Sequence, residues 1–300
     1  MKYYLLETDD NPGSSAEVES RDLPRTETIK SLIFDITAQQ SSGTAATRQN
    51  VAGQIDQIRI GAAESNRVSE IDGEDLDAFN VLHGNNTMFN SAASDNARIS
   101  LGYVYPFDPF ALSPECDYNQ PFGMSGDVAR KVELSYAADG SNIDDKRIAV
   151  GIITSPTQTG GYVAFHRDSY TASSGVNNFT DIPQPGKLLG VLNFETTGAS
   201  DITSDGDHRT TQTIREQSIT INRKDVLGPI YTTTMAAHNG NYEGSITDEG
   251  YSFWNLGFTN KVGSLGVPTS GSIPDNMEIR SLGGAANAAR VYATTLNSNV

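Results

Sequence analysis

A dense group of carboxylates lies in the first half of the chain, where a strand pattern gives way to a helix pattern. Its members are Glu70, Asp72, Glu74, Asp75 and Asp77. Two suitably spaced carboxylates can hydrolyse a glycosidic bond. Acidic residues are also favoured in the first turn of a helix, where one can cap the helix and the others face water. We therefore assign no catalytic residue here, and a β-sandwich hydrolase acting through Asp72 and Asp75 ranks last among the hypotheses.

The residue types that usually bind metals are scattered along the chain. None of the four histidines stands in an H-x-H or H-E-x-x-H pair; they are His83, His166, His208 and His238. Residues 201–207 resemble a calcium loop, but their spacing departs from the EF-hand pattern and the closing Glu is absent. The single Cys116 cannot form an internal disulfide, and a small semi-buried residue or free thiol in a reducing cytosol is its simplest interpretation. We expect no metal ligands.

The sequence also lacks the common motifs of catalysis. It has no G-x-S-x-G, Walker A or G-x-G-x-x-G segment, so acyl transfer, NTP hydrolysis and dinucleotide binding lack their usual signals. We expect no catalytic residues and no cofactor.

Two apolar features are open to more than one interpretation. Phe107, Phe110, Tyr118 and Phe122 lie in a Pro-rich connection over residues 106–126. These aromatics could form a sugar-binding platform, or they could pin the loop onto a sandwich or a neighbouring subunit. Residues 2–6, Lys-Tyr-Tyr-Leu-Leu, could anchor at a lipid boundary, form a frayed end, or donate a strand to a neighbour.

The overall composition limits the classes of partner. The chain has 300 residues and a formal net charge of −16. This argues against direct binding to nucleic acid, because contacts to phosphate need a basic surface. No apolar run approaches the length of a membrane span, and the N-terminus turns acidic before a signal peptide could form.

The chain carries the same order of elements twice. Strand-like runs in the first half have partners in the second at an offset that falls smoothly from about 160 to about 140 residues, as two copies of one domain would show. The pairs are 57–61 with 218–222, 99–104 with 251–256, 132–135 with 277–280, and 147–152 with 290–294. Residues 69–80, which include a short predicted helix, are paired with 223–231.

These elements predict an all-β chain of two consecutive jelly-roll β-sandwiches with long loops and a few short helices. We expect a flexible N-terminal arm over residues 1–25, a first jelly roll over 26–157 and a second over 158–300. About six strands are recognisable in each half, whereas a jelly roll has about eight. The missing strands are expected in the long connections.

One local motif resembles a known family. The strand Ile55–Ile60 has the I-x-x-I-x-I pattern, and Gly73-Glu74-Asp75-Leu76 has the G-x-D-L pattern of a short helix. Together they resemble the first jelly roll of the double jelly-roll major capsid proteins of adenoviruses and of tailless, membrane-containing bacterial and archaeal viruses. The second half departs from this pattern, since Lys224-Asp225-Val226-Leu227 lacks the preceding Gly and Gly228-Pro229 would interrupt a helix.

The resemblance implies a structural role. It implies a homotrimer whose six similar domains form a pseudo-hexameric capsomer of an icosahedral shell, in contact with neighbouring capsomers and with minor capsid or vertex proteins. It further implies location in the virion, assembly in the host cytoplasm, no direct contact with nucleic acid, and an internal membrane that the N-terminal arm could reach.

The main alternative is a two-domain β-sandwich carbohydrate-binding protein or adhesin. The composition, rich in Thr and Asn, and the aromatic residues of the Pro-rich connection would suit this class. It predicts a monomer or small oligomer that binds glycan and normally carries a secretion signal.

Overall fold

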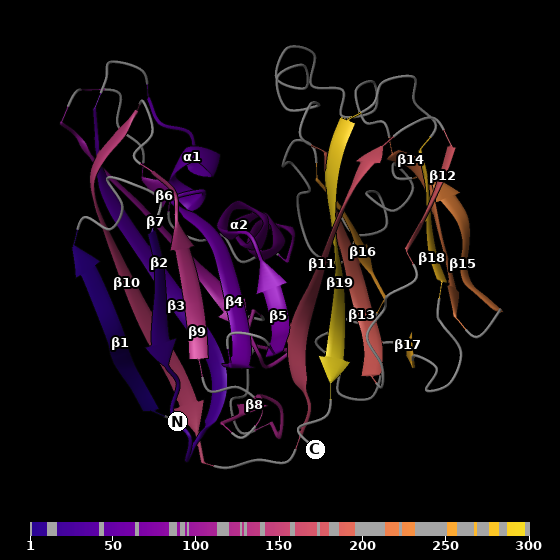
Figure 1. The fold of residues 1–300 in the computed structure, drawn as a ribbon, viewed down its shortest axis with the longest axis horizontal. Helices are drawn as coiled ribbons and strands as arrows, with labels where there is room; N and C mark the ends of the chain where they lie inside the picture. The colour runs from indigo at the N-terminus through magenta and orange to yellow at the C-terminus, as the bar shows by residue number, and fades with distance from the viewer. Residues whose placement is uncertain are drawn as a thin grey trace. The chain divides into compact units, whose positions relative to one another are not determined.

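The computed structural model divides into two compact units, Met1–Ala164 and Phe165–Ser298. Most of the described residues lie in β-strands (Figure 1). The structure describes residues 2–10, 17–41, 45–63, 66–83, 89–90, 94, 96–112, 120–126, 128, 131–138, 142–156, 160–172, 175–179, 186–195, 214–221, 224–231, 251–256, 267–268, 276–281 and 287–297.

The first unit contains two antiparallel sheets. The first sheet has the order β1-β10-β3-β7, with a short strand β6 beyond β7 and a short strand β8 against the start of β3. The second sheet has the order β2-β9-β4-β5. The bounds are β1 Lys2–Asp10, β2 Glu17–Asp22, β3 Thr28–Gln40, β4 Ile55–Ala63, β5 Asn66–Ile71, β6 Phe89–Asn90, β7 Arg98–Pro106, β8 Met124–Ser125, β9 Lys131–Tyr136 and β10 Ile143–Ser155.

The second unit repeats this arrangement. Its sheets have the orders β11-β19-β13-β16, with a short β17 beside β13, and β12-β18-β14-β15. The bounds are β11 Tyr162–Ala172, β12 Gly175–Phe179, β13 Gly186–Glu195, β14 Ile214–Ile221, β15 Lys224–Tyr231, β16 Tyr251–Asn255, β17 Val267–Pro268, β18 Asn276–Ser281 and β19 Asn287–Asn297.

The predicted duplication is confirmed by this topology. The predicted pairs place β10 and β7 at the positions of β19 and β16, and β9, β4 and β5 at those of β18, β14 and β15. The structure adds a pair that was not predicted, because β3 lies between β10 and β7 as β13 lies between β19 and β16. The short β8 and β17 also occupy matching positions, beside β3 and β13. Among the described strands, each unit therefore has one four-stranded sheet and one sheet of four main strands with short strands added, and the predicted all-β double jelly roll is confirmed.

The prediction of a flexible arm over residues 1–25 is wrong for the two strands that this segment contains. Strand β1 pairs with β10 from Lys2 opposite Thr154 to Asp10 opposite Arg147, and β2 pairs with β9. These are two of the missing strands of the first jelly roll. The local sequence did not reveal them because their ladder partners lie far along the chain, and such pairing overrides weak local propensity.

The pairing of residues 69–80 with 223–231 needs a second correction. In the first half, β5 forms a hairpin with β4 and is followed by helix α2, Gly73–Leu82. In the second half, Lys224–Tyr231 is strand β15, which forms the corresponding hairpin with β14. Residues 224–231 therefore match β5 and not the helix, and Gly228-Pro229 stands in an edge strand, where a missing backbone donor is tolerated.

The core of the first unit follows from strand alternation. Along β3, Leu32, Phe34 and Ile36 are fully buried between the sheets, whereas Asp35 faces solvent. Strands β7 and β10 repeat the pattern. The buried residues of the facing sheet include Ile58, Ile60, Val132 and Leu134.

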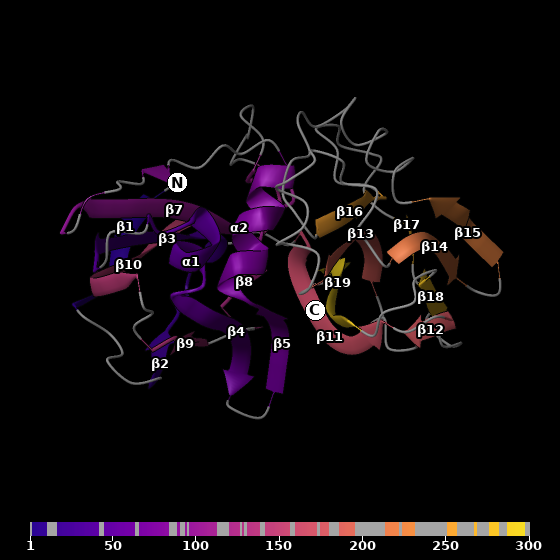
Figure 2. The ribbon, with the colours of Figure 1, turned by 90° about the horizontal axis from the view of Figure 1, so that it is seen from above.

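Two helices pack against the strands of this unit. Helix α1, Arg48–Ala52, contacts β3 and β7, and α2 contacts β7 of one sheet and β4 of the other. Figure 2 shows both helices beside the strands that they cover. Among the described residues, no helix has the length and apolar character needed to cross a membrane.

A buried lysine organises the Pro-rich connection after β7. The Lys30 ammonium and the Asp108 carboxylate are both fully buried, with Nζ 3.3 Å from Oδ2. The same Nζ donates to the backbone carbonyls of Gln120, at 2.6 Å, and Phe122. The connection therefore folds around one charge, because a buried ammonium must keep its donors satisfied.

The same connection is bonded to the start of β11. The amide of Val163 donates a hydrogen bond to the carbonyl of Phe107 at 2.8 Å. The amide of Gly123 donates one to the carbonyl of Gly161 at 3.0 Å. A Cβ on Gly160 would lie 2.0 Å from the carbonyl oxygen of Pro121, so only glycine fits there. The Lys30 cluster thus holds β3, the connection and the chain that leads to β11.

We expect Lys30→Met to lower the free energy of unfolding by about 3–5 kcal/mol, because it leaves the Asp108 carboxylate buried without its counter-ion. Chemical denaturation measures this change. The control Lys131→Met removes an exposed ammonium on β9 and should change stability by no more than about 0.5 kcal/mol. Equal losses in the two variants would contradict the role of Lys30.

Candidate functional site

The G-x-D-L motif lies at a point of very close packing. A Cβ on Gly73 would lie 2.3 Å from the carbonyl oxygen of Ile55, 2.8 Å from that of Ala52 and 2.9 Å from the Tyr103 hydroxyl. No real Cβ is accommodated at such distances, so glycine is required where α2 begins. The predicted strand and helix are confirmed as β4 and α2, and Gly73 is the residue that allows their contact.

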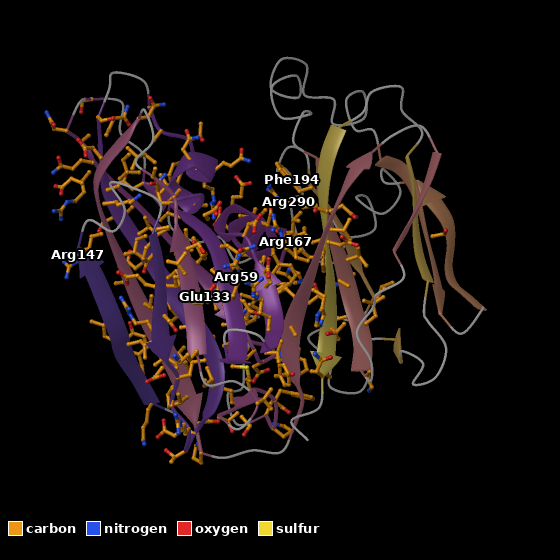
Figure 3. The ribbon with its side chains drawn as sticks, viewed as in Figure 1. Arg59, Glu133, Arg147, Arg167, Phe194 and Arg290 are labelled. Atoms are coloured by element: carbon orange, nitrogen blue, oxygen red, sulfur yellow. The ribbon has the colours of Figure 1, made fainter. Side chains whose placement is uncertain are left out.

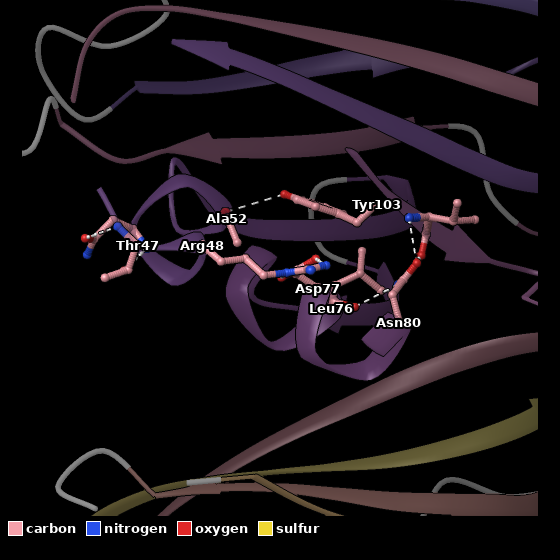
Figure 4. A network of polar contacts seen from close by, with 9 residues as sticks. Thr47, Arg48, Ala52, Leu76, Asp77, Asn80 and Tyr103 are labelled. Atoms are coloured by element: carbon pink, nitrogen blue, oxygen red, sulfur yellow. Dashed lines mark hydrogen bonds and ion pairs between the residues drawn. The ribbon is translucent and has the colours of Figure 1, made fainter. Parts of the chain in front are cut away.

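Helices α1 and α2 are joined by polar contacts (Figure 4). Arg48 on α1 makes a bidentate ion pair with Asp77 on α2, with Nε–Oδ2 and Nη2–Oδ1 distances of 2.6 and 2.8 Å. Thr47 caps α1 in a capping box with Asn50. The Tyr103 hydroxyl lies 3.5 Å from the carbonyl of Ala52. The two helices therefore form one layer against β7.

Most of the acidic group does not face water, contrary to the sequence interpretation. Asp75 is fully buried and Asp77 is nearly so, while Asp72 stands at the N-cap position with no side-chain capping bond. Glu74 accepts a hydrogen bond from Gln49, and Glu70 accepts one from Gln57. These residues hold strands and helices together because α2 is packed against two strands and α1, a fact that local sequence does not reveal.

Asn80 completes the hydrogen bonding of a strand. Its side-chain Oδ1 accepts from the Val104 amide at 2.9 Å, and its Nδ2 donates to the Val104 carbonyl at 2.8 Å and to the Leu76 carbonyl at 2.8 Å. One buried side chain thus replaces a neighbouring strand along this stretch of β7. It blocks an edge that could otherwise pair with another chain.

The outer face of the sheet β2-β9-β4-β5 carries a row of charges. Glu133 on β9, Arg59 on β4 and Glu70 on β5 stand opposite one another in the register. The Arg59 Nη1 lies 2.8 Å from Glu133 Oε1, and its Nε lies 3.7 Å from Glu70 Oε2. Figure 3 labels the Arg59–Glu133 pair. Arg67 adds a 3.2 Å contact to Glu70.

These charges suit cross-strand pairing better than the binding of a small anion. Arg59, Arg67 and Lys131 line a shallow hollow, but Glu133 lines it too and Glu70 pairs with both arginines.

In the second unit, the Arg290 guanidinium on β19 lies 4.3 Å from the centroid of the Phe194 ring on β13, directly across the ladder (Figure 3).

Each of the two histidines that the structure describes has a ring nitrogen within hydrogen-bond distance of another group of the fold. His83 ends α2, with Nδ1 2.8 Å from the carbonyl of Phe79, and burial lowers its pKa to about 4. The hydrogen bond to Phe79 opposes that shift in part. His166 on β11 has Nε2 2.9 Å from the Thr295 hydroxyl, and burial lowers its pKa to about 4 as well.

The aromatic residues of the Pro-rich connection pack inward. Phe107 is fully buried and its ring centroid lies 4.8 Å from that of Tyr105, while Phe110 contacts Phe122 at 5.7 Å. They pin the connection onto the sandwich, which was one of the two interpretations. Tyr118, Cys116, His208, His238 and residues 201–207 lie outside the described residues.

The described part of the chain contains no group of three or more His, Cys, Asp or Glu residues placed to hold a metal ion. The polar side chains described above bond to neighbouring strands, helices and loop backbone.

Comparison with known proteins gives no match by sequence. No family model matches the chain, and no curated protein matches it. Solved structures do match over nearly the whole length. The STIV major capsid protein is 11% identical with a TM-score of 0.68, and the match covers 98% of this chain and 96% of that chain.

Two further solved structures show the same likeness. The major capsid protein P2 from bacteriophage PM2 is 12% identical with a TM-score of 0.66, covering 99% of this chain and 98% of that one. The PBCV-1 virus capsid is 9% identical with a TM-score of 0.61, covering 99% and 95%. The chain has the double jelly-roll fold of major capsid proteins. The double jelly-roll resemblance inferred from Ile55–Ile60 and Gly73–Leu76 is confirmed as a likeness of fold.

We expect Gly73→Ala to destabilise the first jelly roll by at least about 1–3 kcal/mol, the usual cost of overpacking, because the new methyl group would overlap two carbonyl oxygens. Denaturant titration of unfolding measures the loss. The matched control is Gly102→Ala on β7, where the nearest atom to a new Cβ lies 3.6 Å away, an ordinary contact. A neutral Gly73→Ala variant would contradict the packing described here.

We expect the stability of the first jelly roll to fall as the pH drops from about 6.5 toward 4. Folding lowers the pKa of His83, so as the pH falls the unfolded chain is protonated first, and this protonation stabilises the unfolded state relative to the folded one. Above pH 6.5 the contribution of neutral His83 is fully present. His83→Gln should reduce this pH dependence of the unfolding free energy. The control His166→Gln should leave unchanged the part of the pH dependence that comes from His83. An unchanged slope in His83→Gln would disprove the assignment.

Proposed function

We propose that the chain is a major capsid protein, a structural subunit of an icosahedral virus shell. The observation that carries the proposal is the match of both jelly rolls, in order, to capsid proteins over 98–99% of this chain. A shared single jelly roll would say little about function, because that fold serves many roles. Two in tandem, at matching length, form a much narrower class.

The site chemistry supports a role exerted through surfaces. Within the described residues, the carboxylates of the α1–α2 region and the charged row on β9, β4 and β5 are engaged in holding elements together. The proposal therefore assigns no catalytic activity to the chain.

The proposed assembly is a homotrimer. Two similar units in each of three chains give six similar domains, and a trimer of this kind forms a pseudo-hexameric capsomer that can tile a shell beside neighbouring capsomers. The proposal includes location in the virion after assembly in the host cytoplasm, and contacts with minor capsid or vertex proteins.

The proposed shell encloses a membrane and makes no direct contact with nucleic acid. The net charge of −16 supports the second point, because an acidic surface repels phosphate. A membrane contact through a flexible N-terminal arm loses its basis, since Lys2–Asp10 is a strand of the first sheet. The carbohydrate-binding alternative is also weakened, because Phe107 and Phe110 are buried and cannot stack on a sugar.

We expect the purified chain to form a stable trimer of about three times 32.2 kDa with a pseudo-hexagonal outline. Light scattering gives the mass and negative-stain imaging gives the outline. A monodisperse monomer at high concentration would refute the capsomer. Specific binding in a glycan array by that monomer would favour the adhesin alternative.

A further inference from the structure

A hollow at one end of the first sheet gathers cationic residues on a chain that is acidic as a whole. It has a volume of about 220 Å³ and is formed by three adjacent strands, β10, β3 and β7. We call it the Arg98 hollow. The lining residues that enter the argument are Thr37, Gln39, Arg98, Asp145, Lys146 and Arg147.

A β-bulge shapes this hollow. On β10, Asp144 stands opposite Gln39 of β3. Arg147 stands opposite Thr37, so β10 has one residue more than β3 between the two pairs. Asp145 lies in this bulge and has a φ of 47°, in the left-handed region. Bulges bend a strand and redirect the side chains beside them, and here the redirected side chains include Arg147.

Two arginines reach the hollow from opposite sides of β3. Arg147 on β10 stands opposite Thr37, and the register places both on the solvent-facing side of the sheet. Arg98 on β7 stands opposite Gln39, on the same side. Both arginines are exposed, and Figure 3 shows Arg147 at the periphery of the sheet. Because β10 and β7 lie about 10 Å apart across β3, two arginine side chains can converge on one small ligand.

Arg98 is the cation that is available to a ligand. Its guanidinium makes no ion pair and no side-chain hydrogen bond within the part of the chain that the structure describes. Arg59 and Arg67, by contrast, are both paired with carboxylates. A guanidinium presents five donors in a planar fork that matches the oxygens of an oxyanion. Arg147 has further contacts within the chain, so the proposal depends first on Arg98.

The neighbouring groups favour an anion, with one exception. Thr37 and Gln39 are half-buried beneath the arginines and offer a hydroxyl and an amide as neutral donors. The Lys146 ammonium is not a direct ligand, because it points into the sandwich, where it donates to the Gln54 side chain at 3.1 Å. Asp145 is the exception, since its carboxylate opposes a bound anion and limits the affinity.

We propose that the Arg98 hollow binds a small oxyanion of the phosphate class. The two guanidiniums would donate from the sides, and Thr37 and Gln39 from below. Phosphate suits this arrangement because its oxygens accept paired hydrogen bonds from arginine, and the volume leaves room for part of its hydration shell. The anion would be a free ion or the phosphate of a lipid headgroup. The inference goes beyond the proposed capsid function and does not depend on it.

The first test is calorimetric titration of inorganic phosphate into the full chain at low ionic strength. We expect saturable binding, and we expect Arg98→Gln to raise the dissociation constant at least about tenfold, because charge-assisted hydrogen bonds are lost. The matched control is Arg67→Gln, which removes an exposed arginine of the same unit that is paired with Glu70. It should bind phosphate like the unmodified chain.

The second test uses the opposing carboxylate. Asp145→Asn should lower the dissociation constant by about two- to fivefold, because it removes an exposed negative charge beside the bound anion. Asparagine tolerates the left-handed backbone at this position, so the fold should be retained. A damaged fold could not tighten binding, so this variant remains informative if Arg98→Gln proves unstable. Added sodium chloride should weaken binding by screening.

The outcomes separate this inference from the capsid proposal. Absence of saturable phosphate binding, or equal binding by a folded Arg98→Gln variant, would overturn the inference and leave the trimer prediction untouched. Unchanged or weaker binding by Asp145→Asn would also count against it.

Vesicles containing phosphatidic acid distinguish the two sources of phosphate. Co-sedimentation that free phosphate competes away, and that Arg98→Gln abolishes, would assign the hollow to a lipid headgroup. Binding of inorganic phosphate without co-sedimentation would assign it to a free ion.

Discussion

The first jelly roll depends on the burial of one ammonium group. Lys30 lies at the start of β3, and its Nζ contacts Asp108, Gln120 and Phe122, which come from both ends of the Pro-rich connection. A charge without water must be fully paired, so the connection is constrained to a single path around it. That path presents the carbonyl of Phe107 to Val163 and thereby sets where β11 begins.

The edges of the sheets follow from a second constraint, that every strand has two sides to satisfy. On β7, helix α2 and Asn80 take up one side, and this requires the close approach that Gly73 permits. Strand β1, at the other end of the same sheet, pairs with β10 on one side and has no second neighbour among the described strands. The two ends of this sheet therefore differ in how the backbone groups of the edge strand are satisfied.

Several arginines of the first unit are paired with carboxylates, although the chain as a whole is strongly acidic. Arg59, Arg67 and Arg48 each contact a carboxylate of the same unit, so these cations serve the fold. The net charge of −16 keeps separated subunits apart in solution.

Much of the fold could be predicted from the sequence, because strand alternation and turn residues are local signals. The order of the duplicated strands, the I-x-x-I-x-I strand and the helix that begins at Gly73 were all recognisable without coordinates. The likeness of fold to capsid proteins was also recognisable at this level, from a short motif at the step from β4 to α2.

Non-local pairing decided the rest. Residues 2–6 could be seen as a strand donated to a neighbour, but strand β1 pairs within its own chain, with Tyr3 opposite Ile153, and no local pattern specifies a partner so distant in the sequence. The burial of Asp75 and Asp77 and the pairing of Lys30 with Asp108 depend in the same way on elements that meet only after folding. Composition and periodicity determined which residues could form strands and cores, whereas the tertiary structure decided which charges are buried and which edges stay open.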